Sequence, residues 1–184
     1  MADNMLDGKP PDEVYFGLSE KNTWNDVMFG FGKKRIVIAS PMDGIVMPVS
    51  KVNDAVFSED VLGRGVAIKP ESGRVIAPCK ATVIQMFETG HAVSLRTDSG
   101  VELLIHVGID TVKLKDRHYS ICKNSGESAN AGDVLMEFDA AGIIAEGFDT
   151  ITPIVVCNPD DFSDIFFAPE GRIREGESLI TVMK

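Results

Sequence analysis

The chain has 184 residues and a formal net charge of −10, with 44% hydrophobic and 25% charged residues. This composition is typical of a globular protein with one domain, or one domain and a tail, that is long enough to bury a substantial core. The negative charge argues against a nucleic-acid partner, because such binding depends on Lys and Arg neutralising phosphates, and it is compatible with a basic protein partner.

The three cysteines, Cys79, Cys122 and Cys157, are scattered without a motif. Each lies in or beside an apolar run, which favours small buried hydrophobic residues. An odd number of cysteines without a signal peptide points to the reducing cytoplasm. No apolar run approaches the length of about 18 residues that a membrane span requires. We therefore expect a cytoplasmic protein.

Residues 1–35 are predicted to be an N-terminal extension, partly disordered or forming a short amphipathic helix, ahead of a domain at residues 36–184. Apolar residues recur at helical spacing within residues 23–31, after a threonine suited to the N-cap. A helix this short would be marginal in water on its own. It either packs on the domain or lies weakly at a membrane surface, helped by the basic residues 33–35.

From Ile36 onward, short β-type runs alternate with Gly, Pro and Asp. This pattern, with no long helical period, predicts an all-β antiparallel sandwich or barrel-like fold with at most short helical turns, one of them near residues 140–145. The predicted strands outside the central hairpin are residues 36–40, 44–49, 66–70, 74–78, 82–87, 133–138, 151–157 and 178–182.

Residues 91–113 are predicted to form a β-hairpin with one histidine on each arm. With residues 97–100 as the loop, His91 faces His106 and Val93 faces Leu104. Side chains that face each other directly in an antiparallel pair have Cβ atoms about 4.5–5.5 Å apart. The pattern therefore predicts two adjacent imidazoles on a largely apolar face.

Three interpretations of this histidine pair compete. The first is a hydrogen-bonded pair without chemistry. The second is a zinc site in which Asp110 adds a carboxylate to His91 and His106, although two histidines make a weak site and no established zinc spacing is present. The third is a nucleophilic imidazole that carries a group while its neighbour stabilises the developing charge. Gly108 favours the third by leaving room for an approaching group, and Thr89 offers a hydroxyl near His91.

Several segments in order resemble the glucose-type enzyme IIA of the bacterial phosphoenolpyruvate-dependent sugar phosphotransferase system. They are GVAIKP (65–70), FETGHA (87–92), DSGVELLIHVGIDTVKL (98–114) and TPIVV (152–156). The resemblance implies that His106 is phosphorylated, that His91 supports it and that Thr89 belongs to their hydrogen-bond network. It implies that phosphate comes from the histidine-containing phosphocarrier protein and passes to the IIB domain of a sugar permease. Relatives also bind transporters or kinases when unphosphorylated, which makes a regulatory binding module a second expectation.

The resemblance also implies a docking rim around the histidines. Its predicted members are Asp54, Val56, Phe57, Phe87, Leu104, Gly108, Asp110, Val112 and Lys113. The apolar members would form a ring and the two aspartates would attract a basic partner. Lys113 departs from the family, which usually has an acidic residue there, and Leu104 replaces a commoner aromatic residue. No cofactor is required, and any membrane contact would come through the permease or weakly through the N-terminal segment.

Weak internal repetition suggests an alternative class. Residues 38–49 resemble residues 76–87, and residues 168–173 repeat the Ala-Pro-x-Gly core. Such duplication is similar to barrel-sandwich hybrids, which include biotinyl and lipoyl carrier domains. Those carriers present a lysine in a Met-Lys-Met or Asp-Lys-Ala context, and neither tripeptide occurs here. A swinging-arm carrier is therefore the weaker expectation.

Overall fold

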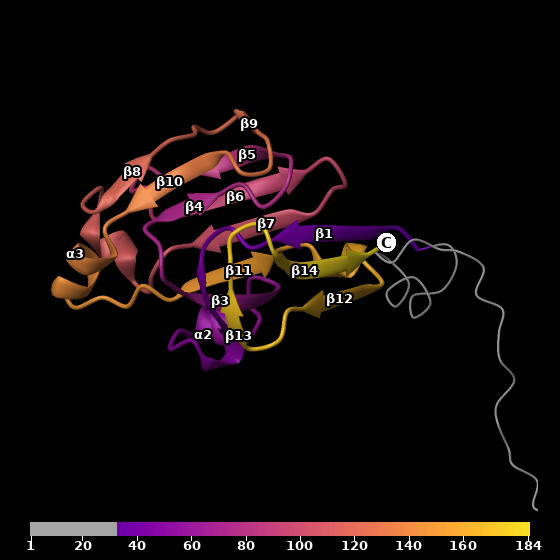
Figure 1. Cartoon of the computed structure of the whole chain (residues 1–184), viewed down its shortest axis with the longest axis horizontal. Coiled ribbons are helices and arrows are strands. Elements are labelled where there is room, and N and C mark those ends of the chain that lie inside the picture. The colour runs from indigo at the N-terminus through magenta and orange to yellow at the C-terminus, as the bar shows by residue number, and fades with distance from the viewer. Residues whose placement is uncertain (1–32) are drawn as a thin grey trace, which may run out of the picture. The chain divides into compact units, whose positions relative to one another are not determined.

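The computed structural model describes residues 33–184. The amphipathic stretch predicted within residues 23–31 lies outside the described residues, so it and the domain boundary at residue 35 stay predictions. Within residues 33–184, the strands form three antiparallel sheets joined by turns and short helices (Figure 1).

The largest sheet has eight strands in the order β13-β2-β3-β11-β7-β6-β5-β9. Its strands are β2 (Gly44–Pro48), β3 (Arg64–Pro70), β5 (Ala81–Met86), β6 (Ala92–Thr97), β7 (Glu102–His106), β9 (Ser128–Ala129), β11 (Thr152–Val156) and β13 (Gly171–Ile173). Two sheets of three strands have the orders β1-β14-β12 and β4-β10-β8. Their strands are β1 (Arg35–Ala39), β4 (Arg74–Ile76), β8 (Tyr119–Ile121), β10 (Val134–Phe138), β12 (Asp164–Phe167) and β14 (Ser178–Met183). The strand that ends at His106, β7, thus lies inside the large sheet, between β11 and β6.

The helices are all short. They are η1 (Val49–Lys51), α2 (Ala55–Ser58), η2 (Thr111–Leu114), α3 (Ala140–Ala145) and η3 (Pro159–Asp161). Both α-helices begin after an aspartate whose side chain accepts a backbone hydrogen bond, Asp54 from Val56 and Asp139 from Gly142. Among residues 33–184, no helix is both long enough and apolar enough to cross a membrane.

The prediction of an antiparallel all-β fold with short helical turns is confirmed. Every strand predicted from Ile36 onward is present within a few residues of its expected bounds, and the turn expected near residues 140–145 is α3. The sequence patterns do not predict β8, β9, β12 or β13. Each of these strands has between two and four residues, too few for an alternation of period two to show.

Alternation along β6 and β7 directs side chains into two hydrophobic clusters. Val93 and Ile105 belong to the larger cluster, whereas Ala92 and Leu104 belong to a smaller one. The other buried members of the smaller cluster are Val49, Val52, Phe57, Ala67 and Val155. Because His106 has the same phase as Leu104 along β7, its side chain emerges beside the smaller cluster.

The register of the β6–β7 hairpin differs from the prediction by one residue. Ala92, rather than His91, lies opposite His106. The cause is the loop, which comprises residues 98–100 instead of four residues and has Gly100 in the left-handed region with φ of +88°. Such odd-length loops, with glycine at the left-handed position, are a common hairpin type. The predicted register was wrong because it assumed a symmetric, even loop.

Candidate functional site

His91 and His106 lie together at the open end of the hairpin, one just before β6 and the other at the end of β7. Their rings meet edge to face, with centroids 4.8 Å apart and planes at 81°. The shifted register puts the two residues out of phase, but His91 lies at a bend before β6, so strand alternation does not fix its direction. The two imidazoles therefore lie together, as predicted, although the predicted register was wrong by one residue.

The orientation of His106 is set by a backbone carbonyl. Its Nδ1 lies 2.8 Å from the carbonyl oxygen of Gly108. A carbonyl oxygen can only accept, so in the neutral ring Nδ1 carries the hydrogen and Nε2 keeps a lone pair. The ring of Phe57 packs against the imidazole with centroids 5.2 Å apart. The Gly108 carbonyl thus fixes the tautomer of His106 and leaves the lone pair of the neutral ring on Nε2.

Gly108 has a backbone conformation and surroundings that require a glycine. Its φ of +82° lies in the left-handed region. A Cβ at this position would clash with the side-chain methyl of Thr111 and with the backbone oxygen of Asp149. The glycine therefore lets the backbone place its carbonyl beneath His106. Its predicted role of leaving room for an approaching group stays a prediction.

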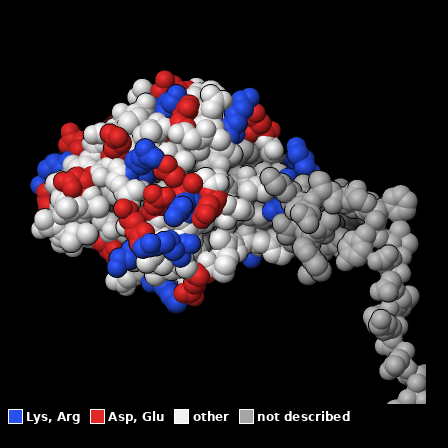
Figure 2. All heavy atoms as spheres, viewed as in Figure 1, with Lys and Arg blue, Asp and Glu red and all other residues white. Residues whose placement is uncertain are grey.

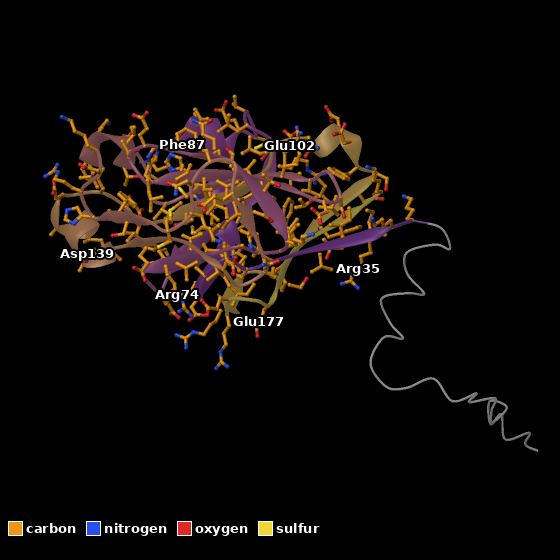
Figure 3. All side chains as sticks on the ribbon, turned by 90° about the horizontal axis from the view of Figure 1, so that it is seen from above. Arg35, Arg74, Phe87, Glu102, Asp139 and Glu177 are labelled. Carbon is orange, nitrogen blue, oxygen red and sulfur yellow. The ribbon has the colours of Figure 1, made fainter. Side chains whose placement is uncertain are left out.

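His91 is held by side chains. Its Nδ1 shares a hydrogen bond with the hydroxyl of Thr89, and the Phe87 ring packs edge-on with centroids 5.6 Å apart. The turn before β6 places Thr89 there, and Gly90 adopts φ of +71° within it. Phe87 lies on the side of the molecule opposite Arg74 and Glu177 (Figure 3). The residue is only 4% exposed, so His91 is a buried neighbour of the half-buried His106.

Burial keeps both imidazoles neutral. Removal from water, reinforced by the proximity of His106, lowers the pKa of His91 to about 4. Burial also lowers the pKa of His106, opposed by its hydrogen bond to Gly108 and by the charges of Asp54 and Asp110. Two neutral rings at pH 7 leave a free lone pair on His106, which is the form that nucleophilic attack requires.

The predicted rim is only partly at the surface. Val56 and Val112 are 43% and 52% exposed, whereas Phe57 and Leu104 are 5% and 9% exposed and belong to the smaller hydrophobic cluster. The prediction of an exposed ring containing all the apolar members is therefore corrected. Phe57 and Leu104 pack beneath the site, and Phe87 is half-buried beside it.

The charges on the rim are also arranged differently from the prediction. Lys113 Nζ lies 2.8 Å from Asp110 Oδ2, and both side chains are exposed. Asp110, which was predicted to attract a basic partner, instead forms a local ion pair with Lys113. Asp54 remains as the helix cap of α2, with its carboxylate accepting from the Val56 N–H at 2.9 Å.

The residues present supply only part of a metal site. Among residues 33–184, no group of three or more His, Cys, Asp or Glu side chains is placed to hold a metal ion. His91 and His106 would provide two of the four ligands that zinc usually takes, and Asp110 is paired with Lys113. Zinc at this pair stays a prediction that requires ligands from another molecule.

Sequence reasoning missed the residues that support the loop after β7. The Val107 carbonyl accepts hydrogen bonds from the hydroxyls of Thr111, at 2.7 Å, and Tyr119, at 3.0 Å. The Gly108 and Ile109 N–H groups donate to the carbonyls of Ile151 and Asp149. Apart from the Thr111 contact, which spans four residues, these contacts join segments distant in sequence, so no local pattern signals them.

Several known proteins are similar to this chain over most of its length. Residues 36–162 match a family model described as phosphoenolpyruvate-dependent sugar phosphotransferase system, EIIA 1. The glucose-specific EIIA component of Haemophilus influenzae is 36% identical over 162 residues, which cover 86% of this chain and 97% of that protein. The solved structure of glucose permease IIA from Mycoplasma capricolum has a TM-score of 0.76 at 29% identity, covering 84% of this chain and 99% of that one.

Other relatives are much longer. The beta-glucoside-specific EIIBCA component of Bacillus subtilis is 40% identical over 148 residues, which cover 80% of this chain but 24% of that protein. The chain spans a quarter or less of the EIIBCA relatives that it matches. These matches do not favour the biotinyl or lipoyl alternative. From the family match over residues 36–162 and the relative matched over nearly its full length, the chain belongs to the EIIA 1 family of the phosphoenolpyruvate-dependent sugar phosphotransferase system.

Proposed function

We propose that this protein is a phosphoryl carrier of the sugar phosphotransferase system and that Nε2 of His106 carries the phosphoryl group as a phosphohistidine. The observation that carries the proposal is the 2.8 Å contact between His106 Nδ1 and the Gly108 carbonyl, which leaves Nε2 unprotonated beside a second neutral imidazole.

In the forward step, the Nε2 lone pair of His106 attacks phosphorus. The N–P bond forms as the bond between phosphorus and the donor's leaving atom breaks, and that electron pair returns to the donor. The hydrogen on Nδ1 stays in its bond to the Gly108 carbonyl, so no proton has to leave the site. Phosphoryl transfer of this kind depends mainly on positioning and electrostatics.

His91 is proposed to stabilise the phosphoryl oxygens through Nε2. A neutral imidazole has one N–H, so Nε2 can donate only if Nδ1 accepts from the Thr89 hydroxyl. The arriving phosphoryl group is negatively charged, and a nearby negative charge favours protonation of His91. The low pKa of His91 in the free protein therefore rises once His106 is phosphorylated.

The proposed partners are the histidine-containing phosphocarrier protein as donor and the IIB domain of a sugar permease as acceptor, with transfer taking place in the cytoplasm. In the onward step, a cysteine thiolate of the IIB domain attacks phosphorus and the electron pair of the N–P bond returns to Nε2. Similarity to a glucose-specific EIIA component supports a glucose-type sugar, which would bind the permease rather than this chain.

The test is phosphorylation by a phosphoenolpyruvate-driven donor system, followed by mapping of the acid-labile phosphate. His106→Ala should accept no phosphate and keep its fold, because His106 lies at the end of a strand. His118→Ala is the matched control, since His118 interacts with Glu146, 2.9 Å away, instead of with the pair. Labelling of His106→Ala at the wild-type level would refute the assignment.

A further inference from the structure

The two peptide groups on either side of the Val107 Cα are both held by hydrogen bonds. The Val107 N–H donates to the carbonyl of His91 at 2.7 Å, which ties the two histidine segments together. The Val107 carbonyl accepts from Thr111 and from Tyr119. Val107 is therefore a junction between the backbone of His91, the backbone of His106 and two side-chain hydroxyls.

Tyr119 contacts both arms of this junction. Its hydroxyl donates to the Val107 carbonyl at 3.0 Å, while its Cβ lies so close to Gly90 that a Cβ added there would be only 2.9 Å away. Gly90 lies in the turn that presents Thr89, the partner of His91. One side chain on β8 thus braces the turn that holds His91 and the loop that holds His106.

We propose that Tyr119 is a positioning residue for phosphoryl transfer, acting through the Val107 carbonyl on the loop that aligns His106. The inference rests on the proposed function. Val107 C=O and Gly108 N–H belong to one planar peptide. The Tyr119 hydroxyl thus holds the peptide that precedes the one whose carbonyl, that of Gly108, contacts His106. Burial raises the pKa of Tyr119, which keeps the hydroxyl protonated and able to donate.

The hydroxyls of Thr111 and Tyr119 share one acceptor, the Val107 carbonyl, so removing one of them should have only a moderate effect on the transfer rate. Thr111 is fully buried and still holds the Val107 carbonyl when the Tyr119 hydroxyl is removed. Tyr119→Phe should therefore loosen the loop without collapsing it. Small misplacements of reacting groups lower rates substantially, because transfer requires a near-attack arrangement. The double variant Tyr119→Phe/Thr111→Val removes both donors and should lose more than the product of the single losses.

The experiment compares the wild type with Tyr119→Phe, Thr111→Val, the double variant and Ser163→Ala. The last is a matched control, because Ser163 also donates a hydroxyl to a backbone carbonyl, that of Met183, at 3.2 Å. One readout is the single-turnover rate constant at saturating donor together with the apparent affinity for the donor. The second is ¹⁵N NMR of the imidazoles, which reports which nitrogen of His106 carries hydrogen and needs no donor.

Tyr119→Phe should lower the rate constant about threefold to tenfold, as expected for loss of one hydrogen bond, with donor affinity within about twofold. The share of His106 protonated at Nδ1 should fall, while Ser163→Ala changes neither quantity. An unchanged His106 tautomer in Tyr119→Phe overturns the inference, and so does a changed tautomer at an unchanged rate. If the wild type accepts no phosphate, the proposed function fails, and the tautomer measurement alone decides whether Tyr119 positions His106.

Discussion

His91 and His106 are the same residue type in mutual contact, yet their partners differ in kind. His106 is held by the backbone carbonyl of Gly108, whereas His91 is held by the side chain of Thr89. A carbonyl can only accept, so it fixes one tautomer of His106. A hydroxyl can donate or accept, so Thr89 can remain hydrogen-bonded to Nδ1 of His91 whether or not that nitrogen carries a hydrogen. The difference supports a fixed nucleophile beside an adaptable neighbour.

This difference predicts that His91→Gln separates the two half-reactions. Glutamine keeps an N–H donor for the phosphoryl oxygens, so acceptance by His106 should continue. It cannot become cationic or exchange protons as an imidazole does, so onward transfer should slow more than acceptance, by a factor of about 10²–10⁴ if His91 acts as a general acid or base. Separate measurement of donor-to-protein and protein-to-IIB rates checks this, and equal losses would mean that His91 only positions the phosphate.

The depressed pKa of His91 also predicts a pH dependence of stability. The folded state keeps His91 neutral down to a pH of about 4, whereas the unfolded chain takes up a proton below its ordinary value of 6.5. The unfolded state therefore binds more protons in this window, and the free energy of unfolding falls as the pH drops below 6.5. Denaturant titrations at pH 7.0 and 5.5 should show a loss of roughly 1 kcal/mol from this residue, and His91→Gln should reduce the loss. An identical pH dependence in both proteins would contradict the buried neutral state.

Among the elements, the β6–β7 hairpin shows which features can be predicted from the sequence and which depend on the loop and the tertiary structure. Its arms follow from alternating apolar residues, and the meeting of the histidines follows from its closure. Its register depends on the loop at residues 98–100, whose odd length the alternation could not specify. The carbonyl that orients His106 comes from Gly108. The Tyr119 hydroxyl, which donates to the neighbouring Val107 carbonyl, comes from a separate strand that only the tertiary structure brings to the site.

Two glycines of this hairpin and the loop after it give a matched test of the loop geometry. Gly100 and Gly108 both have left-handed backbones, with φ of +88° and +82°. A Cβ on Gly100 meets nothing within 4 Å, whereas one on Gly108 clashes with Thr111 and Asp149. Gly100→Ala should therefore lower the free energy of unfolding only by the cost of a left-handed backbone at alanine, about 1–2 kcal/mol, and leave phosphate acceptance intact. Gly108→Ala should cost more stability and greatly reduce acceptance, because the partner of His106 is displaced.

Denaturation curves and single-turnover phosphorylation of both glycine variants measure these effects. If Gly108→Ala accepts phosphate as fast as Gly100→Ala does, the Gly108 carbonyl does not set the reactive tautomer.

At the scale of the whole molecule, many exposed charged side chains of residues 33–184 take part in ion pairs. Exposed cations pair with carboxylates far along the chain, as Arg74 does with Glu175 and Arg172 with Glu71. Figure 2 shows acidic and basic side chains interspersed over the face in view. Exposed pairs of this kind contribute only about 0–1 kcal/mol each to stability, so they are easily exchanged for contacts with a partner. We therefore expect the charges closest to the site to control the docking rate of a partner protein.

The pair formed by Lys113 and Asp110 tests whether local or total charge controls docking. Replacing Lys113 with Glu removes one positive charge, adds one negative charge and releases Asp110 from its ion pair, so a basic donor should dock faster. Lys80→Glu makes the same change in net charge at a pair with the same chemistry, 3.0 Å from Asp98, at the opposite end of the hairpin from the histidines. At physiological ionic strength, exposed charges are screened beyond about 8 Å. Lys113→Glu should therefore raise the initial phosphorylation rate at low salt, with a gain that shrinks as salt is added, whereas Lys80→Glu should change this rate much less.

The measurement is the initial phosphorylation rate of the wild type and both variants across a salt series. Equal gains in the two variants would show that the field of the whole molecule steers the donor, and coincidence of Lys113→Glu with the wild type at every salt concentration would remove Lys113 from the docking rim.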